Sequence, residues 1–423
     1  MTVPEIDPTD PSVLFDPFAT YDTAREASPI ARMQVPGMGS LWIATRYQDA
    51  REVLGGGRFE LSGSSFMRPP GIPEHCLRYL RTMAEMEGPE HLRLRTLAAP
   101  AFTASRARAF RPRIERIVNG LLDGLHDALP HTRPHTRPDR LPDEPIDLIE
   151  HFARPLPMDV ICELVGIPTE DRPQWRDYGT AVVSGFGPAF LDAIPRIIEG
   201  AQKAVADRKA LADRKALADK MGVSAKKAEA GDDLISTLLQ VRSDDGDRLT
   251  DDELVTLVWH LVLAGQTPTN LIANAVEVLL THPEHLAALR ADPSLMPRAV
   301  EELTRWVGPQ LLTTPRFAKE DVTFGDVTVR KGEPVSAAIV SANRDPRAFD
   351  QPDTLDLTRS GPGHLGYAHG PHFCLGAAFA RAETEIALTA LITRYPNLKL
   401  AGTPERSPDP GTWRLTTLPV TLH

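Results

Sequence analysis

Apolar residues recur at helical spacing along most of the chain. Between residues 104 and 128 they form one stripe, made of Ile114, Ile117, Val118, Leu121, Leu122 and Leu125. From residue 250 to residue 281 the chain is apolar nearly all round, after a capping box of Thr250 and Glu253. A helix of about 30 residues with this pattern is expected to lie buried in the middle of the protein. Residues 375–394 return to the helical pattern.

Strand patterns are fewer and shorter. Two apolar runs, residues 30–33 and 41–45, flank a Pro-Gly-Met-Gly turn at 36–39 and predict a hairpin. Residues 310–340 alternate and carry β-branched residues, which is typical of strands. Residues 58–85 are broken by Gly, Ser and Pro and predict a long loop, and such loops are usually functional. The pattern therefore predicts a mostly α-helical fold with a smaller β portion.

Two short duplications interrupt the pattern. His-Thr-Arg-Pro occurs at 131–134 and again at 135–138, inside the Pro-rich and Arg-rich segment 130–145. Proline after each unit breaks the helix that metal ligands at His131 and His135 would need, so a metal site is disfavoured there. Ala-Asp-Arg-Lys-Ala-Leu occurs at 206–211 and again at 212–217, and it lengthens an exposed helix. We expect 130–145 and 206–220 to be surface insertions.

Composition and charge narrow the class of protein. The 423 residues include 47 Lys and Arg against 57 Asp and Glu, a net charge of −10 that argues against nucleic-acid binding. No run of about 18 apolar residues exists, so no membrane span is expected, and the N-terminus has no signal-peptide pattern. Cys76, Cys162 and Cys374 lie too far apart for a C-x-x-C metal site. A globular protein of the reducing cytoplasm is the simplest prediction.

The segment around Cys374 differs from those around the other two cysteines. Glycines stand four residues before it and two residues after it, and a helix is predicted to begin just beyond. Backbone amides and a helix N-terminus can stabilise a thiolate in such a loop. The full pattern is Tyr367-x-x-Gly370-x-His372-x-Cys374-x-Gly376. It resembles the haem-binding loop of the cytochrome P450 superfamily, with Tyr367 where the family usually has Phe.

Three further motifs match that family in the same order, so the resemblance runs over roughly residues 10–420. It implies a single cytochrome P450 domain over residues 1–423, with haem b between the long central helix and the Cys374 loop. Cys374 is then the iron ligand, and its thiolate favours O–O cleavage. His91 and Arg95, at i, i+4 spacing, are expected to bind the haem propionates together with Arg316 and His372.

A second motif has a structural role. Glu302 and Arg305 lie on one helix face at i, i+3 spacing. In the family such a pair is buried and is completed by an arginine from an irregular segment, which the spacing of residues 345–359 indicates to be Arg359. Loss of one partner from a buried network of this kind is expected to cost several kcal/mol.

The long helix departs from the family. Most relatives have an acid at the position of Thr267 and a threonine at that of Pro268, a pair that relays protons during oxygen activation. Pro268 cannot donate to the carbonyl of Ala264, so we expect the helix to kink and leave that carbonyl free to hold water beside Gly265. Thr267 and Thr269 are candidate hydroxyl donors. The catalytic candidates are therefore Ala264, Gly265, Thr267, Pro268 and Thr269.

Several residues are expected to line a substrate pocket because of their position in a chain of this family. The candidates come from the 58–85 loop, the helices near 180–192, the long helix and the strand after Arg305. They are Phe66, Met67, Val183, Phe186, Phe190, Leu261, Leu311, Leu312 and Thr313. Each of these apolar residues is individually more often plain core than a substrate contact.

The resemblance to soluble bacterial members implies a separate ferredoxin and ferredoxin reductase as electron donors. Arg106, Arg108, Arg111 and Arg113 can meet an acidic ferredoxin, and a solvated helix face explains them equally well. A monomer is favoured.

The leading function is a haem-thiolate monooxygenase of bacterial specialised metabolism. It would hydroxylate or epoxidise a bulky small molecule such as a macrolide, a terpenoid or a peptide. Because the acid–alcohol pair is missing, one alternative is oxidative C–C or C–O coupling on aromatic or cyclic-dipeptide substrates. A haem carrier or sensor is the non-enzyme alternative.

Overall fold

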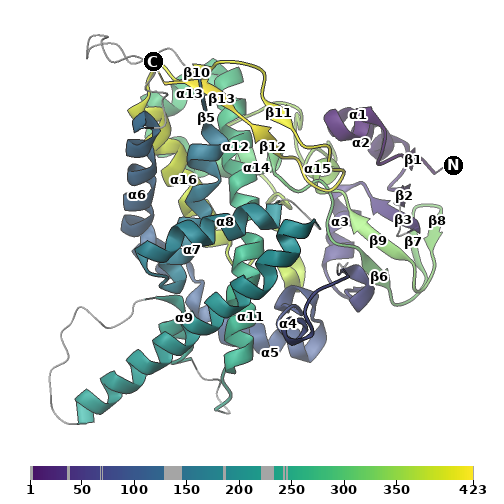
Figure 1. Ribbon diagram of the computed structural model, residues 1–423. Coiled ribbons are helices and arrows are strands. Elements are labelled where there is room, and N and C mark those ends of the chain that lie inside the picture. The colour runs from purple at the N-terminus through teal and green to yellow at the C-terminus, as the bar shows by residue number, and fades with distance from the viewer. Residues whose placement is uncertain are drawn as a thin grey trace. The chain divides into compact units, whose positions relative to one another are not determined.

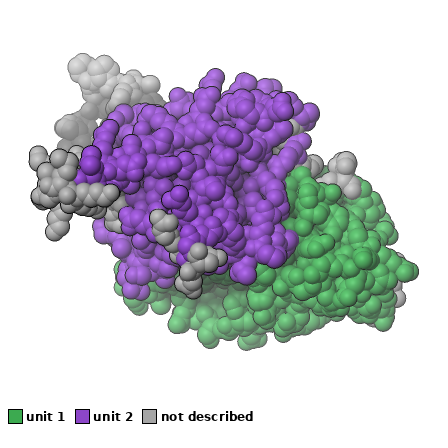
Figure 2. Space-filling view, turned by 90° about the horizontal axis from the view of Figure 1, so that it is seen from below, with its two compact units in different colours: residues 1–66, 118–153, 267–423 green, residues 67–117, 154–266 purple. Residues whose placement is uncertain are grey.

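The computed structural model describes residues 3–35, 39–66, 68, 70–127, 145–183, 187–220, 233–241, 243 and 246–422. The chain divides into two compact units, each built from discontinuous segments (Figure 2). Unit 1 comprises residues 1–66, 118–153 and 267–423, and unit 2 comprises residues 67–117 and 154–266. The segment 130–145, expected to be a surface insertion, lies outside the described residues apart from its last residue.

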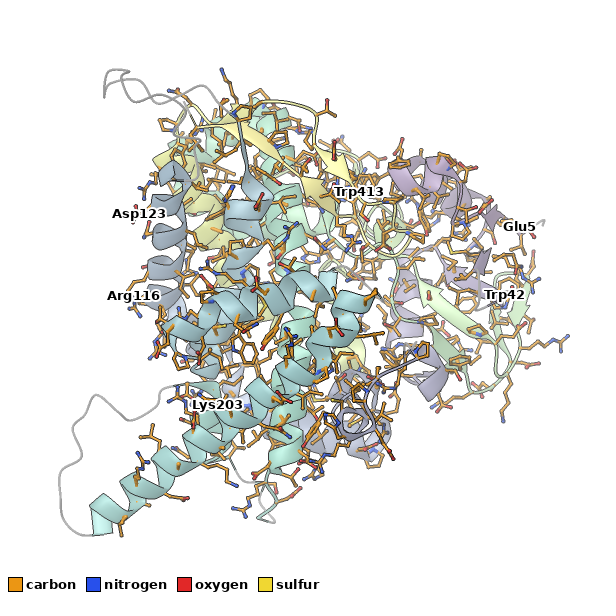
Figure 3. All side chains as sticks on the ribbon, in the orientation of Figure 1. Glu5, Trp42, Arg116, Asp123, Lys203 and Trp413 are labelled. Carbon is orange, nitrogen blue, oxygen red and sulfur yellow. The ribbon has the colours of Figure 1, made fainter. Side chains whose placement is uncertain are left out.

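The main sheet of unit 1 has the strand order β1-β2-β3-β9-β6-β4. Its strands are β1 (Glu5–Ile6), β2 (Ile30–Val35), β3 (Gly39–Ala44), β4 (Phe59–Glu60), β6 (Arg316–Ala318) and β9 (Pro334–Ala337). The predicted hairpin is confirmed, because β2 and β3 are antiparallel with Ile30 opposite Ala44. β3 and β9 are parallel, with Trp42 opposite Val335 (Figure 3 labels Trp42). Ile30, Trp42 and Val335 belong to one buried core with Phe59.

Smaller sheets complete the β portion of unit 1. They pair β7 (Val322–Phe324) with β8 (Val327–Val329), β11 (Glu405–Arg406) with β12 (Leu415–Thr417), and β13 (Pro419–Thr421) with both β10 (Lys399–Leu400) and β5 (Ile146–Asp147). The strands predicted between 310 and 340 are thus present.

Helices hold more residues of unit 1 than strands do. They are α1 (Pro11–Phe15), α2 (Pro17–Ala27), α3 (Tyr47–Leu54), α12 (Gln266–Thr281), α13 (Pro283–Ala291), α14 (Met296–Val307), α15 (Ile339–Ala342) and α16 (Ala377–Arg394). The predicted helix at 104–128 is α6 (Ala104–Asp127), whose second half belongs to this unit. There Arg394 pairs with Asp123 (2.5 Å) and the Tyr395 hydroxyl donates to the Leu122 carbonyl (2.9 Å), which ties α6 to α16.

Unit 2 is helical in its described residues. It holds α4 (Glu74–Leu77), α5 (Gly88–Ala98), α7 (Pro155–Val165), α8 (Arg172–Val183), α9 (Pro188–Lys220), α10 (Leu234–Leu238) and α11 (Asp251–Ala264). α9 packs along α11 and α8 (Figure 1). The second duplication lies in α9, where Leu217 is exposed. The region expected to be a loop, 58–85, also forms short elements, namely β4, α4 and two 3-10 turns at Gly63–Ser65 and Met83–Glu85.

Candidate active site

The Cys374 loop lies just before α16. A 3-10 turn, Gly370–His372, precedes Cys374, and the backbone N–H of Cys374 donates to the Tyr367 carbonyl (2.9 Å). Cys374 is exposed, whereas Cys76 and Cys162 are buried. Burial raises the pKa of the Cys162 thiol to about 12, which disfavours its thiolate form. Of the three cysteines, Cys374 is therefore the one whose sulfur is open to a ligand.

Gly370 is required by the path of this loop. Its φ is +75°, in the left-handed region that favours glycine. A Cβ added there would lie 2.7 Å from the Leu54 carbonyl oxygen at the end of α3, closer than real Cβ atoms approach. Pro371 packs against the residues that follow α3, since a Cβ on Gly56 would lie 3.2 Å from the Cγ of Pro371. The loop is thus seated directly on the C-terminus of α3.

The side chains of Glu302, Arg305 and Arg359 meet in the interior of unit 1. Arg305 donates to both carboxylate oxygens of Glu302 (2.7 and 2.8 Å), and Arg359 Nε donates to the same two oxygens (3.1 Å each). The side chains of Glu302 and Arg305 are each 2% exposed. Arg305 Nη1 also donates to the carbonyls of Asn343 and Pro352 (2.8 Å each). The network therefore holds the irregular segment that leads to the Cys374 loop.

A second ionic cluster beside the loop was not found from the sequence. Arg381 donates to both oxygens of Glu301 (2.5 and 2.9 Å), and His364 Nε2 lies 3.2 Å from the same carboxylate. Burial opposes the charge on Glu301, but the bonds from His364 and Arg381 prevail and lower its pKa to about 2. The Arg381 guanidinium lies 4.3 Å from the centre of the Tyr367 ring, a cation–π distance. Arg381 stands seven residues after Cys374, and 80 residues separate it from Glu301.

The four residues expected at the haem propionates lie on three elements. In unit 2, His91 and Arg95 share one face of α5, and His91 is buried. In unit 1, Arg316 on β6 is buried, and His372 ends the turn before Cys374. Cationic and imidazole side chains of this kind are the donors that a carboxylate-bearing group requires.

The long central helix is interrupted. The sequence predicts one kinked helix over residues 250–281, whereas the structure has α11 and α12 separated at Gly265. The predicted kink takes the form of a one-residue interruption at Gly265, whose φ of −62° and ψ of −15° stay in the helical region. Pro268 lies in the first turn of α12, where backbone N–H groups have no partner within the helix, so its missing N–H is tolerated. The capping box is present, since the Thr250 hydroxyl accepts from the Glu253 N–H (3.2 Å).

Close packing surrounds the break on the unit 2 side. A Cβ on Gly265 would lie 2.6 Å from Cδ1 of Ile161, so α7 packs against the backbone at this point. The Gly265 N–H donates to the Leu261 carbonyl (2.9 Å), which completes the last turn of α11. The other motif residues differ in exposure: Ala264 is exposed, Thr267 and Pro268 are half-buried, and Thr269 is buried.

Two of the residues expected to line the substrate pocket are buried in the structure. Leu311 is buried in a core cluster of unit 1, because neighbouring residues of an extended segment point in opposite directions. Phe190 is buried in unit 2, with its ring 6.3 Å from that of Trp259.

The other expected pocket residues divide by position. Leu312 and Thr313 line a cavity of unit 1. Phe66 and Leu261 are half-buried. Met67, Phe186 and the side chain of Val183 lie outside the described residues.

Segments far apart in the chain line two cavities, so the sequence predicted as pocket residues only Leu312 and Thr313 of the larger one and no lining residue of the smaller one. The larger, of about 600 Å³, lies in unit 1, and its residues include Leu312, Thr313, Thr314 and Ser336. None of its described lining residues is ionisable. The smaller, of about 180 Å³, lies in unit 2 between α5 and α11, with charged side chains among its lining and His260 on α11.

Within the ranges described above, no group of three or more His, Cys, Asp or Glu side chains is arranged to hold a metal ion. No helix in the same ranges is long and apolar enough to span a bilayer.

Comparison with known proteins identifies the family. The sequence pattern of the cytochrome P450 family matches residues 19–422. The chain is 40% identical to the mycinamicin IV hydroxylase/epoxidase of Micromonospora griseorubida, over 91% of this chain and 89% of that protein. It is 37% identical to cytochrome P450 107B1 of Saccharopolyspora erythraea, over 98% and 96% of the two chains. The bacillaene polyketide synthase cytochrome P450 PksS of Bacillus subtilis has a similar structure, with a TM-score of 0.82, 30% identity, and 98% and 99% coverage.

The chain therefore belongs to the cytochrome P450 family and has its mostly α-helical fold. It is a cytochrome P450 oxidoreductase, a dioxygen-dependent monooxygenase. Membership implies a haem-thiolate cofactor, a small-molecule substrate and redox partners. The donors of unit 1 fit such a group, since they offer an exposed thiol on a loop seated on α3 together with buried Arg316.

Proposed function

We propose that the protein is a haem-thiolate monooxygenase of bacterial specialised metabolism that inserts oxygen into a bulky, uncharged small molecule. Haem b would be held by the Cys374 thiolate, with His91, Arg95, Arg316 and His372 as donors to its propionates. The bound haem supplies the activation of dioxygen. The observation that carries the proposal is the exposed Cys374 on a loop seated on α3 and stabilised by the buried Glu302 network.

The axial ligand is tested by the optical spectrum of the reduced carbon monoxide complex. Cys374→Ser is expected to abolish the red-shifted band that thiolate ligation produces in this family. Cys76→Ser, which changes a buried cysteine of unit 2, is the matched control and is expected to keep the band. Survival of the band in Cys374→Ser would show that another residue ligates the iron.

The class of substrate is supported by the larger cavity and by the relatives. Its lining is uncharged and carries several hydroxyl groups, which suits an uncharged, oxygen-rich molecule. Two of the similar proteins are named for a macrolide hydroxylase/epoxidase and for a polyketide synthase. An optical titration of the ferric enzyme should therefore give a high-spin shift with macrolides or terpenoids. A shift with cyclic dipeptides or aromatic compounds alone would favour the coupling reaction.

Turnover with ¹⁸O-labelled dioxygen then separates the candidate reactions. A product that gains one labelled oxygen atom supports insertion, and a product that loses two hydrogens without gaining oxygen supports C–C or C–O coupling. Binding without any turnover, in the presence of a competent ferredoxin and reductase, would favour the carrier or sensor.

The proton route is proposed to use the break between α11 and α12. Ala264 is exposed and Pro268 cannot donate to its carbonyl, so that carbonyl is available to hold water near Gly265. The hydroxyls of Thr267 and Thr269 are the nearest alcohols in sequence. Pro268→Thr is expected to change the ratio of peroxide released to product formed, and an unchanged ratio would assign Pro268 a purely structural role.

The electron donors are proposed to be a separate ferredoxin and its reductase. Two of the α6 arginines that would meet an acidic ferredoxin already have other partners. Arg106 donates to Thr237 (2.8 Å), and Arg113 lies 3.8 Å from Glu163. Exposed Arg108 is the most available of them. Arg108→Glu is expected to slow reduction at low salt while leaving substrate binding unchanged. The cytoplasmic location and the monomeric state stay predictions.

A further inference from the structure

One wall of the larger cavity is a short loop between β11 and β12. The lining residues that it supplies are Pro408, Pro410, Gly411 and Thr412. Backbone hydrogen bonds join this loop, residues 407–412, to the neighbouring segment, because the N–H groups of Leu311 and Leu312 donate to the Gly411 carbonyl (2.9 and 3.3 Å). Leu312 also lines the cavity. A shift of the loop would therefore change the shape of the cavity.

Asp409 stiffens the loop from within. Its carboxylate accepts hydrogen bonds from the backbone N–H groups of Gly411 (2.8 Å) and Thr412 (3.2 Å). The hydroxyl of Thr412 donates to the same carboxylate (2.7 Å). An aspartate that bonds to the residues just after it fixes a turn. A loop braced in this way moves as one body, so its place depends on how its two stems are held.

Both stems of the loop are held by one cluster. At the second stem, Trp413 is 7% exposed, and its backbone N–H donates to the Pro309 carbonyl (2.7 Å). At the first stem, the Arg406 guanidinium lies 4.0 Å from the centre of the Trp413 ring, a cation–π distance. The Phe18 ring meets the same indole edge-on, with ring centres 5.5 Å apart. Arg406 and Trp413 therefore join the two stems across the base of the loop.

The cluster is anchored to α12. Asn274 is fully buried, and its Nδ2 donates to the carbonyls of Trp413 (2.8 Å) and Val307 (3.3 Å). These bonds orient the amide so that its Oδ1 accepts from Arg406 (3.2 Å). Arg406 also donates to Glu277, one turn further along α12, which supplies the counter-charge for a side chain that is 15% exposed. One guanidinium thus ties the base of the loop to two side chains of this helix.

The same helix carries the candidates for the proton route. Thr267 and Pro268 lie in the first turn of α12, and Asn274 lies seven residues after Thr267. Seven residues are about two helical turns, so Thr267 and Asn274 share one face of the helix, about 10 Å apart along its axis. The helix therefore holds the base of the loop in a fixed relation to these candidates.

We propose that Arg406 is a positioning residue that fixes the 407–412 loop to α12 and so sets the shape of the larger cavity relative to Thr267. It acts through Trp413 and Asn274. A preorganised wall favours ligands that fit it, because such a ligand does not have to order the loop when it binds. The inference rests on the proposed function, since that function assigns this cavity to the substrate. The selected ligand is a bulky, uncharged molecule that fills the cavity up to the loop.

The anchor is tested by hydrogen–deuterium exchange in the haem-loaded enzyme, read at the N–H groups of Leu311, Leu312 and Trp413. Arg406→Met keeps an apolar side chain and removes the charge and the donors. It is expected to speed exchange of these N–H groups about tenfold, the effect of losing one hydrogen bond to a charged group. Arg406→Lys, which keeps a charge beside Glu277, should restore part of the protection.

Arg290→Met is the matched control. Arg290 on α13 is half-buried and donates to the carbonyls of Ile392 and Tyr395 (3.3 and 3.1 Å), so its loss weakens unit 1 away from the loop. It should leave exchange at the same N–H groups within about twofold of wild type. Equal exchange in wild type and Arg406→Met would overturn the proposal, as would an acceleration that Arg290→Met reproduces. If Arg406→Met fails to fold, Trp413→Phe, which weakens the cation–π contact, takes its place with the same expected direction.

Two imidazoles of different bulk show whether the anchored wall belongs to the substrate site. Imidazole and clotrimazole ligate haem iron through the same ring, and clotrimazole adds three aryl rings. Optical titration is expected to show that Arg406→Met weakens clotrimazole binding about fivefold to tenfold and imidazole binding less than twofold. Faster exchange with an unchanged ratio of the two constants would confirm the anchor and place the substrate outside this cavity. That outcome contradicts the proposed function, whereas unchanged exchange contradicts the role of Arg406.

Discussion

Two ion pairs, one from each unit, have the same chemistry and opposite surroundings. In unit 1, the side chains of Glu302 and Arg305 are each 2% exposed and their pair is enclosed by backbone carbonyls. In unit 2, Arg81 and Glu90 at the edge of the smaller cavity are 54% and 49% exposed. A buried pair is screened little and cannot be replaced by water, whereas an exposed pair exchanges readily with solvent. The comparison predicts which pairs carry the structure of the haem-binding loop.

The largest effect is expected from the centre of the buried network. Glu302→Gln removes the charge that faces both Arg305 and Arg359, and leaves the buried guanidinium of Arg305 and the half-buried guanidinium of Arg359 without this counter-ion. We expect a loss of about 3–5 kcal/mol in the free energy of unfolding. Urea denaturation of the haem-loaded enzyme measures it, and the red-shifted carbon monoxide band should weaken because the segment before Cys374 loosens.

Glu90→Gln is the matched control for this prediction, because the same substitution is made in an exposed pair of unit 2. It should leave both the unfolding free energy and the carbon monoxide band nearly unchanged. A loss below about 1 kcal/mol in Glu302→Gln would place the buried pair in the same range as exposed pairs and would remove the contrast.

The second prediction concerns a buried carboxyl group of unit 1 that lacks a cation. Glu383 on α16 is 4% exposed, and burial raises its pKa to about 8 from the ordinary 4.5. The folded protein then keeps a proton that the unfolded chain releases, so the stability due to this group falls as pH rises from 4.5 to 8. Between pH 6 and pH 8, wild type should lose about 2 kcal/mol more than Glu383→Gln, which cannot ionise.

Urea denaturation at the two pH values measures this difference. Glu385→Gln on the same helix is the matched control, because Glu385 is half-buried and should follow the wild-type dependence. Parallel curves for wild type and Glu383→Gln would mean that Glu383 is ionised throughout this range.

Features set by local spacing could be predicted from the sequence, whereas contacts between distant segments could not. The Cys374 loop and the Glu302 pair were predictable, because local spacing specifies them and a buried charge needs a partner. The Glu301–Arg381 pair was missed, since 80 residues separate its members. Leu311 and Leu312 were treated alike, yet one lies in the core and the other lines a cavity, which depends on tertiary register. The cavities depend on how distant segments pack, and no local pattern encodes that.

A smaller effect is expected where one cation joins two elements of unit 2. Arg93 on α5 donates to Asp247 (2.5 Å) and to Glu253 at the start of α11 (2.5 Å), and its side chain is 36% exposed. Arg93→Ala should lower the free energy of unfolding by about 1 kcal/mol, and the difference from wild type should shrink in 1 M salt. Arg298→Ala on α14 of unit 1 is a control, because Arg298 has a carbonyl partner and its effect should vary less with salt. A loss that is unchanged by salt would indicate packing of the Arg93 stem as its cause.

The smallest effect is expected from Arg81, whose exposed pair with Glu90 borders the smaller cavity. Arg81→Ala should change the free energy of unfolding by at most about 0.5 kcal/mol, because solvent replaces the pair. The same substitution removes one of the two lining cations and leaves the lining carboxylates Asp252 and Glu253 in place, so the edge of the cavity becomes more negative. We therefore expect benzylamine, a cation of the same ring size as phenol, to bind the variant more tightly than it binds wild type, while phenol binding changes less than twofold. Calorimetric titration of both compounds measures the difference. Equal benzylamine affinity in the two proteins would mean that neutrality at this edge does not select against charged ligands, and that the apolar interior alone sets the preference.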